Sequence, residues 1–231
     1  MLANGNGKHI VRFMNSISRR RAQSAFTLVG LLVIIAVLAI LAAMLLPALA
    51  KAKQKSKDIQ CVNNLKMDGL AFRIWSGDNN DNYPMAVPGD KGGTKEYDTG
   101  ADTFRHFQVM SNELSTPKTL VCPADERTAA ADFVRLKNIN VSYFVGLDAN
   151  EESPQRFLDG DRNLTADNPP ENGVLKVVPG GRAAWTQAIH INKGNIGLAD
   201  GSVQRLSDTG LRTALQNSGE TTNVWRISLP E

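Results

Sequence analysis

His190, Asp200 and Gly201 form the pattern most suggestive of chemistry, since nine residues separate the histidine from an Asp-Gly pair. A His–Asp pair can orient a base toward a nucleophile. With Gly194 as a turn, the spacing predicts adjacent strands that bring His190 and Asp200 near each other. However, the sequence has no G-x-S-x-G nucleophile elbow, phosphate-binding loop or dinucleotide fingerprint. We therefore expect a structural histidine, an aspartate that shapes a hairpin turn, and no enzyme.

A second pattern places oxygen-bearing side chains at alternate positions. Asp159, Asp161 and Asn163 are spaced as in calcium-binding loops, so calcium is the one metal that the sequence suggests. The segment lacks the glycine and the distant glutamate of an EF-hand loop. The alternative is a polar surface loop made of turn-forming residues. No other cofactor is expected.

Cys61 and Cys122 are the two cysteines, too few for a disulfide scaffold or a zinc site. If the domain is exported they could pair, and closing a loop of this length would stabilise the fold by about 4 kcal/mol. The alternative is a pair of small buried apolar residues.

The most distinctive feature of the chain that carries these residues is a long apolar segment near the N-terminus. Residues 22–50 carry no charge, and 14 of the 21 residues in 26–46 are Phe, Leu, Ile or Val. About 20 apolar residues in a helix cross a hydrocarbon core. Those 14 side chains favour insertion by roughly 4 to 8 kcal/mol, an upper bound because the ends count less. The segment therefore predicts a membrane span.

The charge distribution separates the N-terminal region from the rest. The net charge is +3, but residues 1–50 hold five basic residues and no acid, which leaves the remainder acidic. The basic character therefore belongs to the leader, and no nucleic-acid partner is expected. The apolar segment is longer than the core of a cleaved signal peptide. Because Ala48-Leu49-Ala50 has the form of a cleavage site, removal of the whole segment is the competing outcome.

The residues at the border between the basic and apolar regions match a more specific sequence pattern. Ser24-Ala25-Phe26-Thr27-Leu28-Val29 resembles the processing site of type IV prepilins and type II secretion pseudopilins. The resemblance implies cleavage between Ala25 and Phe26 by a prepilin peptidase that also methylates Phe26. His190 and Asp200-Gly201 resemble the H-X9-DG motif that accompanies this segment in pilin-like proteins of planctomycetes and verrucomicrobia. Two motifs in this order identify the chain as similar to that family.

The chain departs from the family pattern at two positions. Ala25 stands where the residue before the cut is usually Gly, and it is small enough to keep processing. Gly30 stands where the family has a Glu that neutralises the new N-terminal ammonium inside a filament, since a buried unpaired charge is costly. Gly30 therefore favours a minor or tip subunit, or impaired assembly; a divergent paralogue that tolerates the loss is the alternative.

The resemblance also implies an organisation and a set of partners. We expect a leader at 1–25, a transmembrane and assembly helix at 26–47 containing Pro47, and a periplasmic domain at 48–231. Expected partners are the prepilin peptidase/methyltransferase, other pilin-like subunits, inner-membrane lipid and a secretion or pilus assembly machinery. The N-terminus would face the cytoplasm, and the subunit would later join a filament. The alternative function is a permanently anchored periplasmic module that recognises a glycan or an envelope protein.

The expected fold is α+β and pilin-like, with a long N-terminal helix packed on a small antiparallel sheet. Its second half is amphipathic, with Ile59, Val62, Leu65 and Phe72 on the face toward the domain. Asp200-Gly201 predicts a hairpin. Further elements are predicted from propensity and periodicity: helices at 104–115, 125–137 and 207–217, and strands at 140–146, 173–178, 183–190, 194–199, 202–206 and 223–229.

Overall fold

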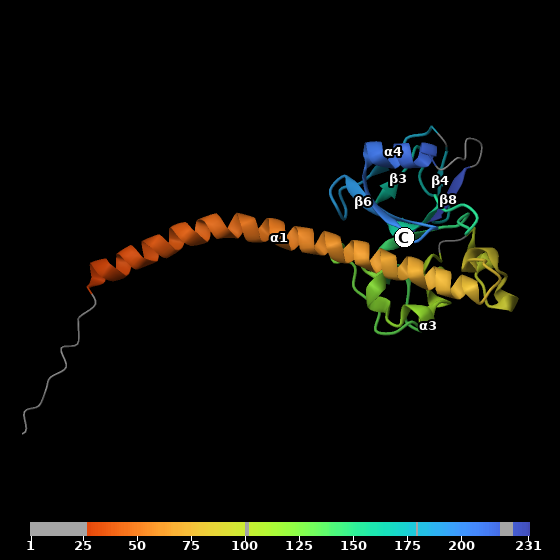
Figure 1. The fold of residues 1–231 in the computed structure, drawn as a ribbon, viewed down its shortest axis with the longest axis horizontal. Coiled ribbons are helices and arrows are strands. Elements are labelled where there is room, and N and C mark those ends of the chain that lie inside the picture. The colour runs from red at the N-terminus through yellow and green to blue at the C-terminus, as the bar shows by residue number, and fades with distance from the viewer. Residues whose placement is uncertain (1–26, 100–101, 179, 218–223) are drawn as a thin grey trace, which may run out of the picture. The chain divides into compact units, whose positions relative to one another are not determined.

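The computed structural model describes residues 27–99, 102–178, 180–217 and 224–231. The chain divides into two units, Met1–Ala48 and Leu49–Glu231. Helix α1 (Leu28–Gly77) begins in the first unit and ends in the second, as the predicted long helix requires (Figure 1). Pro47 lies inside this helix. A proline there has no N–H to donate to the carbonyl of Ala43, so one helical hydrogen bond is missing.

In the second unit, α1 buries one face. Its buried positions follow each other at intervals of three or four residues, which is the helical period: Asp58, Cys61, Leu65, Asp68, Phe72 and Trp75. Leu65 and Phe72 are buried as predicted, but Ile59 is exposed. The buried face of α1 differs from the predicted face because it includes Asp58 and Asp68. The prediction used the spacing of apolar residues only.

The sheet of the second unit has six strands in the order β4-β8-β1-β2-β6-β7, and every adjacent pair is antiparallel. The predicted α+β fold with a helix on an antiparallel sheet is therefore confirmed. A separate two-stranded sheet pairs β3 with β5. The strands are β1 (Tyr143–Gly146), β2 (Phe157–Asp161), β3 (Leu164–Thr165), β4 (Val174–Val177), β5 (Ala184–Trp185), β6 (Lys193–Leu198), β7 (Val203–Ser207) and β8 (Trp225–Ser228).

Both faces of the sheet are covered. Tyr143 and Val145 of β1 belong to the core shared with α1, whereas Phe144 between them belongs to a second core. This alternation follows from the pleat of a strand. The second core includes Leu211 and Leu215 of α4 (Asp208–Asn217), which lies on the face opposite to α1 (Figure 1).

Short helices complete the layer beside α1. The predicted helix at 104–115 forms as two pieces, α2 (Phe104–Gln108) and α3 (Ser111–Leu114). The rest of this layer is built from 3-10 turns: η1 (Pro84–Ala86), η2 (Gly89–Lys91), η3 (Lys95–Tyr97), η4 (Pro117–Leu120) and η5 (Asn138–Asn140).

Two predictions of secondary structure are wrong. No helix forms at 125–137, because Arg127 of that segment donates to the backbone carbonyls of Asn138, Val141 and Pro230. These tertiary hydrogen bonds outweigh a weak helical propensity. The predicted strand at 183–190 is reduced to β5, after which the chain turns toward β6.

Candidate functional site

The first candidate site is the apolar half of α1. Its large apolar side chains are exposed from the start of the helix onward: Leu28, Val29, Leu31, Leu32, Val33, Ile34, Ile35, Val37, Leu38, Ile40, Leu41, Met44, Leu45, Leu46 and Leu49. Within the described residues, α1 is long and apolar enough to cross a membrane. An apolar surface of this size requires lipid or protein around it.

The start of α1 is organised by Thr27. Its hydroxyl oxygen accepts a hydrogen bond from the backbone N–H of Gly30 at 3.2 Å, and its carbonyl accepts from Leu31 at 3.1 Å. Thr27 is thus the N-cap, and Gly30 occupies the position where a glutamate would complete a capping box. Within the part of the chain that the structure describes, a Cβ built on Gly30 would lie 3.2 Å from the Thr27 hydroxyl. The predicted processing residues Ala25 and Phe26 lie outside the described residues.

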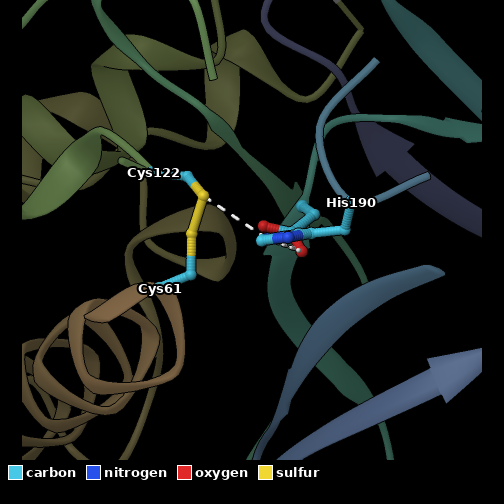
Figure 2. Close-up of side chains that lie close together, drawn as sticks. Cys61, Cys122 and His190 are labelled. Atoms are coloured by element: carbon cyan, nitrogen blue, oxygen red, sulfur yellow. Dashed lines mark hydrogen bonds and ion pairs between the residues drawn. A yellow bond between two sulfur atoms is a disulfide. The ribbon is translucent and has the colours of Figure 1, made fainter. Parts of the chain in front are cut away.

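The second candidate site is a buried polar cluster between α1 and the sheet. Cys61 of α1 and Cys122, which follows η4, are joined by a disulfide, with their Cα atoms 5.0 Å apart. The ring of His190 points toward Cys122 (Figure 2), and the distance from its Nε2 to the Cys122 Sγ is 3.4 Å. The disulfide therefore ties the helix to the layer beside it, and the histidine lies against that link.

His190 is held between two carboxylates. Its Nδ1 lies 3.0 Å from Oδ1 of Asp58, and its Nε2 lies 3.4 Å from Oδ2 of Asp161. Burial lowers the pKa of His190, and the cation of Arg205 adds to that effect, although Asp58 opposes it. The imidazole is accordingly neutral near pH 7, with Nδ1 carrying the proton toward Asp58.

Asp161, on β2, is completely buried. Its Oδ2 accepts hydrogen bonds from the backbone N–H and the side-chain amide of Asn195, at 2.7 and 2.8 Å. Its Oδ1 has no hydrogen-bond partner within the described part of the chain. Burial raises the pKa of Asp161 to about 7, while the two bonds from Asn195 act in the opposite direction. The carboxyl group therefore titrates near neutral pH.

The structure does not bring His190 to Asp200. Gly194 lies inside β6 rather than at a turn, and the six residues of this strand separate the two by roughly 20 Å. Asp200 instead accepts a hydrogen bond from the N–H of Ser202 at 2.8 Å, and Gly201 has a φ of +82°. The predicted Asp-Gly hairpin joins β6 to β7. The link between these residues and the H-X9-DG motif stays a prediction.

The three predicted calcium ligands do not lie in a loop. Asp159 and Asp161 are on β2, a central strand of the sheet, and Asn163 follows it. All three are buried, and the Asn163 amide donates to the carbonyls of Thr186 and Lys193 at 3.0 and 3.1 Å. The expectation of a surface loop is wrong because the alternate polar side chains are those of one face of a strand. Calcium binding itself stays a prediction.

Sequence reasoning missed Asp58, Asn195 and Arg205, which surround His190. Arg205 of β7 pairs with Asp58 of α1, and Asn195 of β6 donates to Asp161. A buried acid on the apolar face of a helix breaks the periodic pattern, and no spacing in the sequence joins it to residues about 130 or more positions away. Since the cluster is enclosed, it can orient side chains, exchange protons or hold an ion.

Comparison with known proteins concerns the N-terminal segment. Residues 20–46 match the family described as the prokaryotic N-terminal methylation motif. No curated protein and no solved structure matches the chain. The matched segment includes the predicted cleavage position and most of the exposed apolar half of α1. In this segment the chain is similar to the methylated N-termini of type IV pilin-like proteins.

Proposed function

We propose that the protein is a structural subunit of a type II secretion pseudopilus. Its precursor is cut between Ala25 and Phe26, and Phe26 becomes N-methylated. The observation that carries this proposal is the methylation motif at residues 20–46, which leads directly into a helix whose apolar side chains are exposed. A secreted protein would lose such a helix, whereas a subunit that assembles through it must keep it.

Assembly in this proposal is a physical process rather than a reaction. The apolar half of α1 leaves lipid and packs against the same segment of neighbouring subunits. Lipid tails and leucine side chains are equally apolar, so close packing of small residues drives the association. Gly30, Ala36, Ala39 and Ala43 provide small side chains along this half of the helix.

Gly30 suggests a minor or tip position. A filament subunit with glutamate here would pair its carboxylate with the N-terminal ammonium of a neighbour. Gly30 offers no side chain for that pair, and the hydroxyl of Thr27 accepts the hydrogen bond from the Gly30 N–H. A subunit at the tip has a neighbour on one side only, so the lost pair costs least there.

The proposed location follows from the same segment. Before assembly the protein crosses the inner membrane once, with the leader in the cytoplasm and the domain from Leu49 onward in the periplasm. The basic run Arg19-Arg20-Arg21 ahead of the span favours this orientation, although Lys51, Lys53 and further lysines after it weaken the preference. The disulfide in the domain fits an oxidising compartment.

The test is the mass of the N-terminal peptide of the protein recovered from its own envelope. The proposal predicts a chain that begins at N-methylated Phe26. An intact Met1 would instead support a permanent anchor with a binding domain. A first residue beyond Ala50 would mean ordinary secretion and would overturn the proposal.

A matched pair of variants sharpens the measurement. Ala25→Gly restores the usual residue before the cut and should be processed at least as well as the native chain. Ala25→Leu places a bulky side chain there and should accumulate the precursor. Equal processing of the two variants would argue against a peptidase that reads this position.

A further inference from the structure

Four buried side chains converge on one point between α1 and the sheet. Cys61, Cys122, Asp161 and His190 each present one potential ligand atom, and these atoms lie within 4.8 Å of one another (Figure 2). We propose that, when Cys61 and Cys122 are thiolates, the four side chains bind one divalent ion of the zinc class in tetrahedral coordination. This proposal concerns the interior of the second unit and does not rest on the pseudopilin function.

The donor set and its spacing fit such an ion. Zinc binds cysteine sulfur, histidine nitrogen and carboxylate oxygen at about 2.0–2.3 Å, which puts the ligand atoms of a tetrahedron roughly 3.3–3.8 Å apart. His190 Nε2 already lies 3.4 Å from Cys122 Sγ, and all four ligand atoms lie within 4.8 Å of one another. The main change is that the two sulfurs separate by somewhat under 2 Å from their bonded distance.

The surroundings orient the ligands as a metal site requires. Metal-binding histidines usually direct the second ring nitrogen at a carboxylate, which fixes the tautomer and strengthens the ligand. Asp58 lies 3.0 Å from the His190 Nδ1 in that position, which leaves Nε2 facing the sulfurs. Asp161 is fixed through Oδ2 by Asn195, while its buried Oδ1 lacks a hydrogen-bond partner among the described residues. That oxygen is available to an ion.

The chemistry of the donors selects the ion. Two thiolates and an imidazole are soft or borderline ligands that favour zinc, whereas calcium prefers six to eight oxygen atoms. Asp161 is also one of the residues in the calcium prediction, so the two ions compete for it. The sulfur ligands decide in favour of zinc.

The ion and the disulfide exclude each other, because both use the same two sulfurs. A newly made chain carries two thiols, which lose two protons when the ion binds. Oxidation by a disulfide oxidant transfers two electrons from the thiolates to that oxidant, which takes two protons from solvent and leaves as a dithiol. The Cys61–Cys122 bond then forms and the ion is released. The metal form is thus the precursor of the disulfide form.

Cobalt is a suitable probe, since its absorption reports both coordination geometry and thiolate ligation. The full chain in mild detergent is reduced with a phosphine, which takes an oxygen atom from water and leaves two thiols. Titration with Co²⁺ should give thiolate-to-cobalt charge transfer and tetrahedral d–d bands that saturate at one ion per chain. Zinc should then remove these bands and raise the melting temperature of the reduced chain. The oxidised chain is the matched control and should show none of these changes.

Two substitutions test the geometry, and one serves as control. His190→Gln removes a ligand and should abolish the tetrahedral spectrum. Asp58→Asn leaves every ligand in place and should weaken the affinity for cobalt about 10–100-fold. Asp200→Asn, at the β6–β7 turn, should leave the affinity unchanged.

Several results would overturn the proposal. These are equal cobalt binding by reduced and oxidised chains, a six-coordinate spectrum without charge transfer, or native affinity in His190→Gln. If the reduced chain unfolds, zinc must restore its circular dichroism, and failure to do so also contradicts the proposal.

Discussion

The two halves of helix α1 differ in polarity and in burial. The more apolar half is exposed, whereas the more polar half buries one face. The half up to Ala48 is apolar, and its side chains are exposed, so no described residue of its own unit buries it. The half from Leu49 to Gly77 buries one face, and that face includes Asp58 and Asp68 beside Leu65 and Phe72. Hydropathy alone does not separate the first half from the core helix of a soluble protein, whereas its exposed side chains do.

Apolar side chains that are exposed in the isolated chain need an environment outside it, so their exposure in the structure does not measure their burial in a membrane or an assembly. Exposed apolar residues in the first half predict an environment outside the chain, whether lipid or neighbouring subunits. A buried carboxylate in the second half contacts residues of its own chain: His190 and Arg205 both lie beside Asp58. Matched substitutions test this comparison, either in the two halves of α1 or on the buried and exposed faces of its second half.

The largest effect is expected at Phe72. Its ring is fully buried and makes edge contacts with Tyr83 and Phe107, with ring centroids 5.9 Å apart in each pair. Phe72→Ala should lower the free energy of unfolding of the domain by about 3–5 kcal/mol. Ile74→Ala, on the exposed face of the same helix, should change it by about 0.5 kcal/mol or less. Denaturant unfolding in mild detergent measures both; similar losses would contradict the assigned buried face.

The next effect compares leucines of equal exposure in the two halves. Leu38 is 59% exposed and Leu70 is 58% exposed. Leu38→Asp should oppose membrane insertion by about 2.5–3.5 kcal/mol, because a carboxylate near the centre of a span is costly. Leu70→Asp should leave insertion unchanged. The fraction of each variant that resists alkaline extraction from membranes is the readout, and equal extraction would contradict a span confined to the first half.

A smaller effect is expected at Gly30. Gly30→Glu supplies the carboxylate that an N-terminal ammonium of a neighbour lacks, and a charged hydrogen bond of this kind is worth about 1.5–3 kcal/mol. Among the described residues, a Cβ there makes one close contact, 3.2 Å from the Thr27 hydroxyl, which a small rotation of that side chain relieves. Assembly should increase by roughly tenfold or more, as measured by the yield of multimers after cross-linking. Gly30→Gln, without the charge, is the control and should give little increase.

The smallest effect, taken per pH unit, is a pH dependence that belongs to the second half. Burial, and then the nearby Asp159, raise the pKa of Asp68 well above its usual value, while Thr119 offsets part of this. The folded state holds the proton more tightly than the unfolded state. The stability from this group is therefore complete below about pH 4 and is lost as pH rises toward the folded pKa.

Asp68→Asn removes that dependence. Relative to the native chain, the variant should gain up to about 1.4 kcal/mol of stability per pH unit across the range between the two pKa values. Unfolding curves at pH 5 and pH 8 give the difference. Asp90→Asn, in the exposed η2 helix, is the matched control. A stability difference between native and Asp68→Asn chains that stays constant with pH would contradict the buried, protonated carboxyl.

The sequence predicted elements that depend on local or periodic signals. The long helix follows from uninterrupted apolar residues, and the β6–β7 hairpin follows from Asp200-Gly201. Strand β2 was missed because Asp159-Gly160-Asp161 has the composition of a turn. What makes it a strand lies elsewhere: Asn195 bonds Asp161, and Gly197 leaves space for Asp159, since a Cβ there would lie 1.9 Å from its Oδ1.

Of the two candidate sites, one depends on local sequence and the other on tertiary structure. The apolar half of α1 could be recognised from sequence, because its function depends on composition within one segment. The cluster around His190 could not, because Asp58 lies in α1, Asp161 lies in β2 and His190 lies in the turn before β6, and only tertiary packing brings them together. Asp200, ten residues beyond His190, was the wrong partner, since the intervening strand is extended.

The central claim is that the apolar half of α1 is kept and becomes the contact between subunits. Site-specific photo-cross-linking in intact envelopes tests it most directly, with the probe at Leu38 in one sample and at Leu70 in the other. The account predicts a ladder of multimers, each step one subunit heavier, from Leu38 when the assembly machinery is present, and a much weaker signal from Leu70. Monomers alone from Leu38, with the machinery present and Phe26 processed, would contradict it.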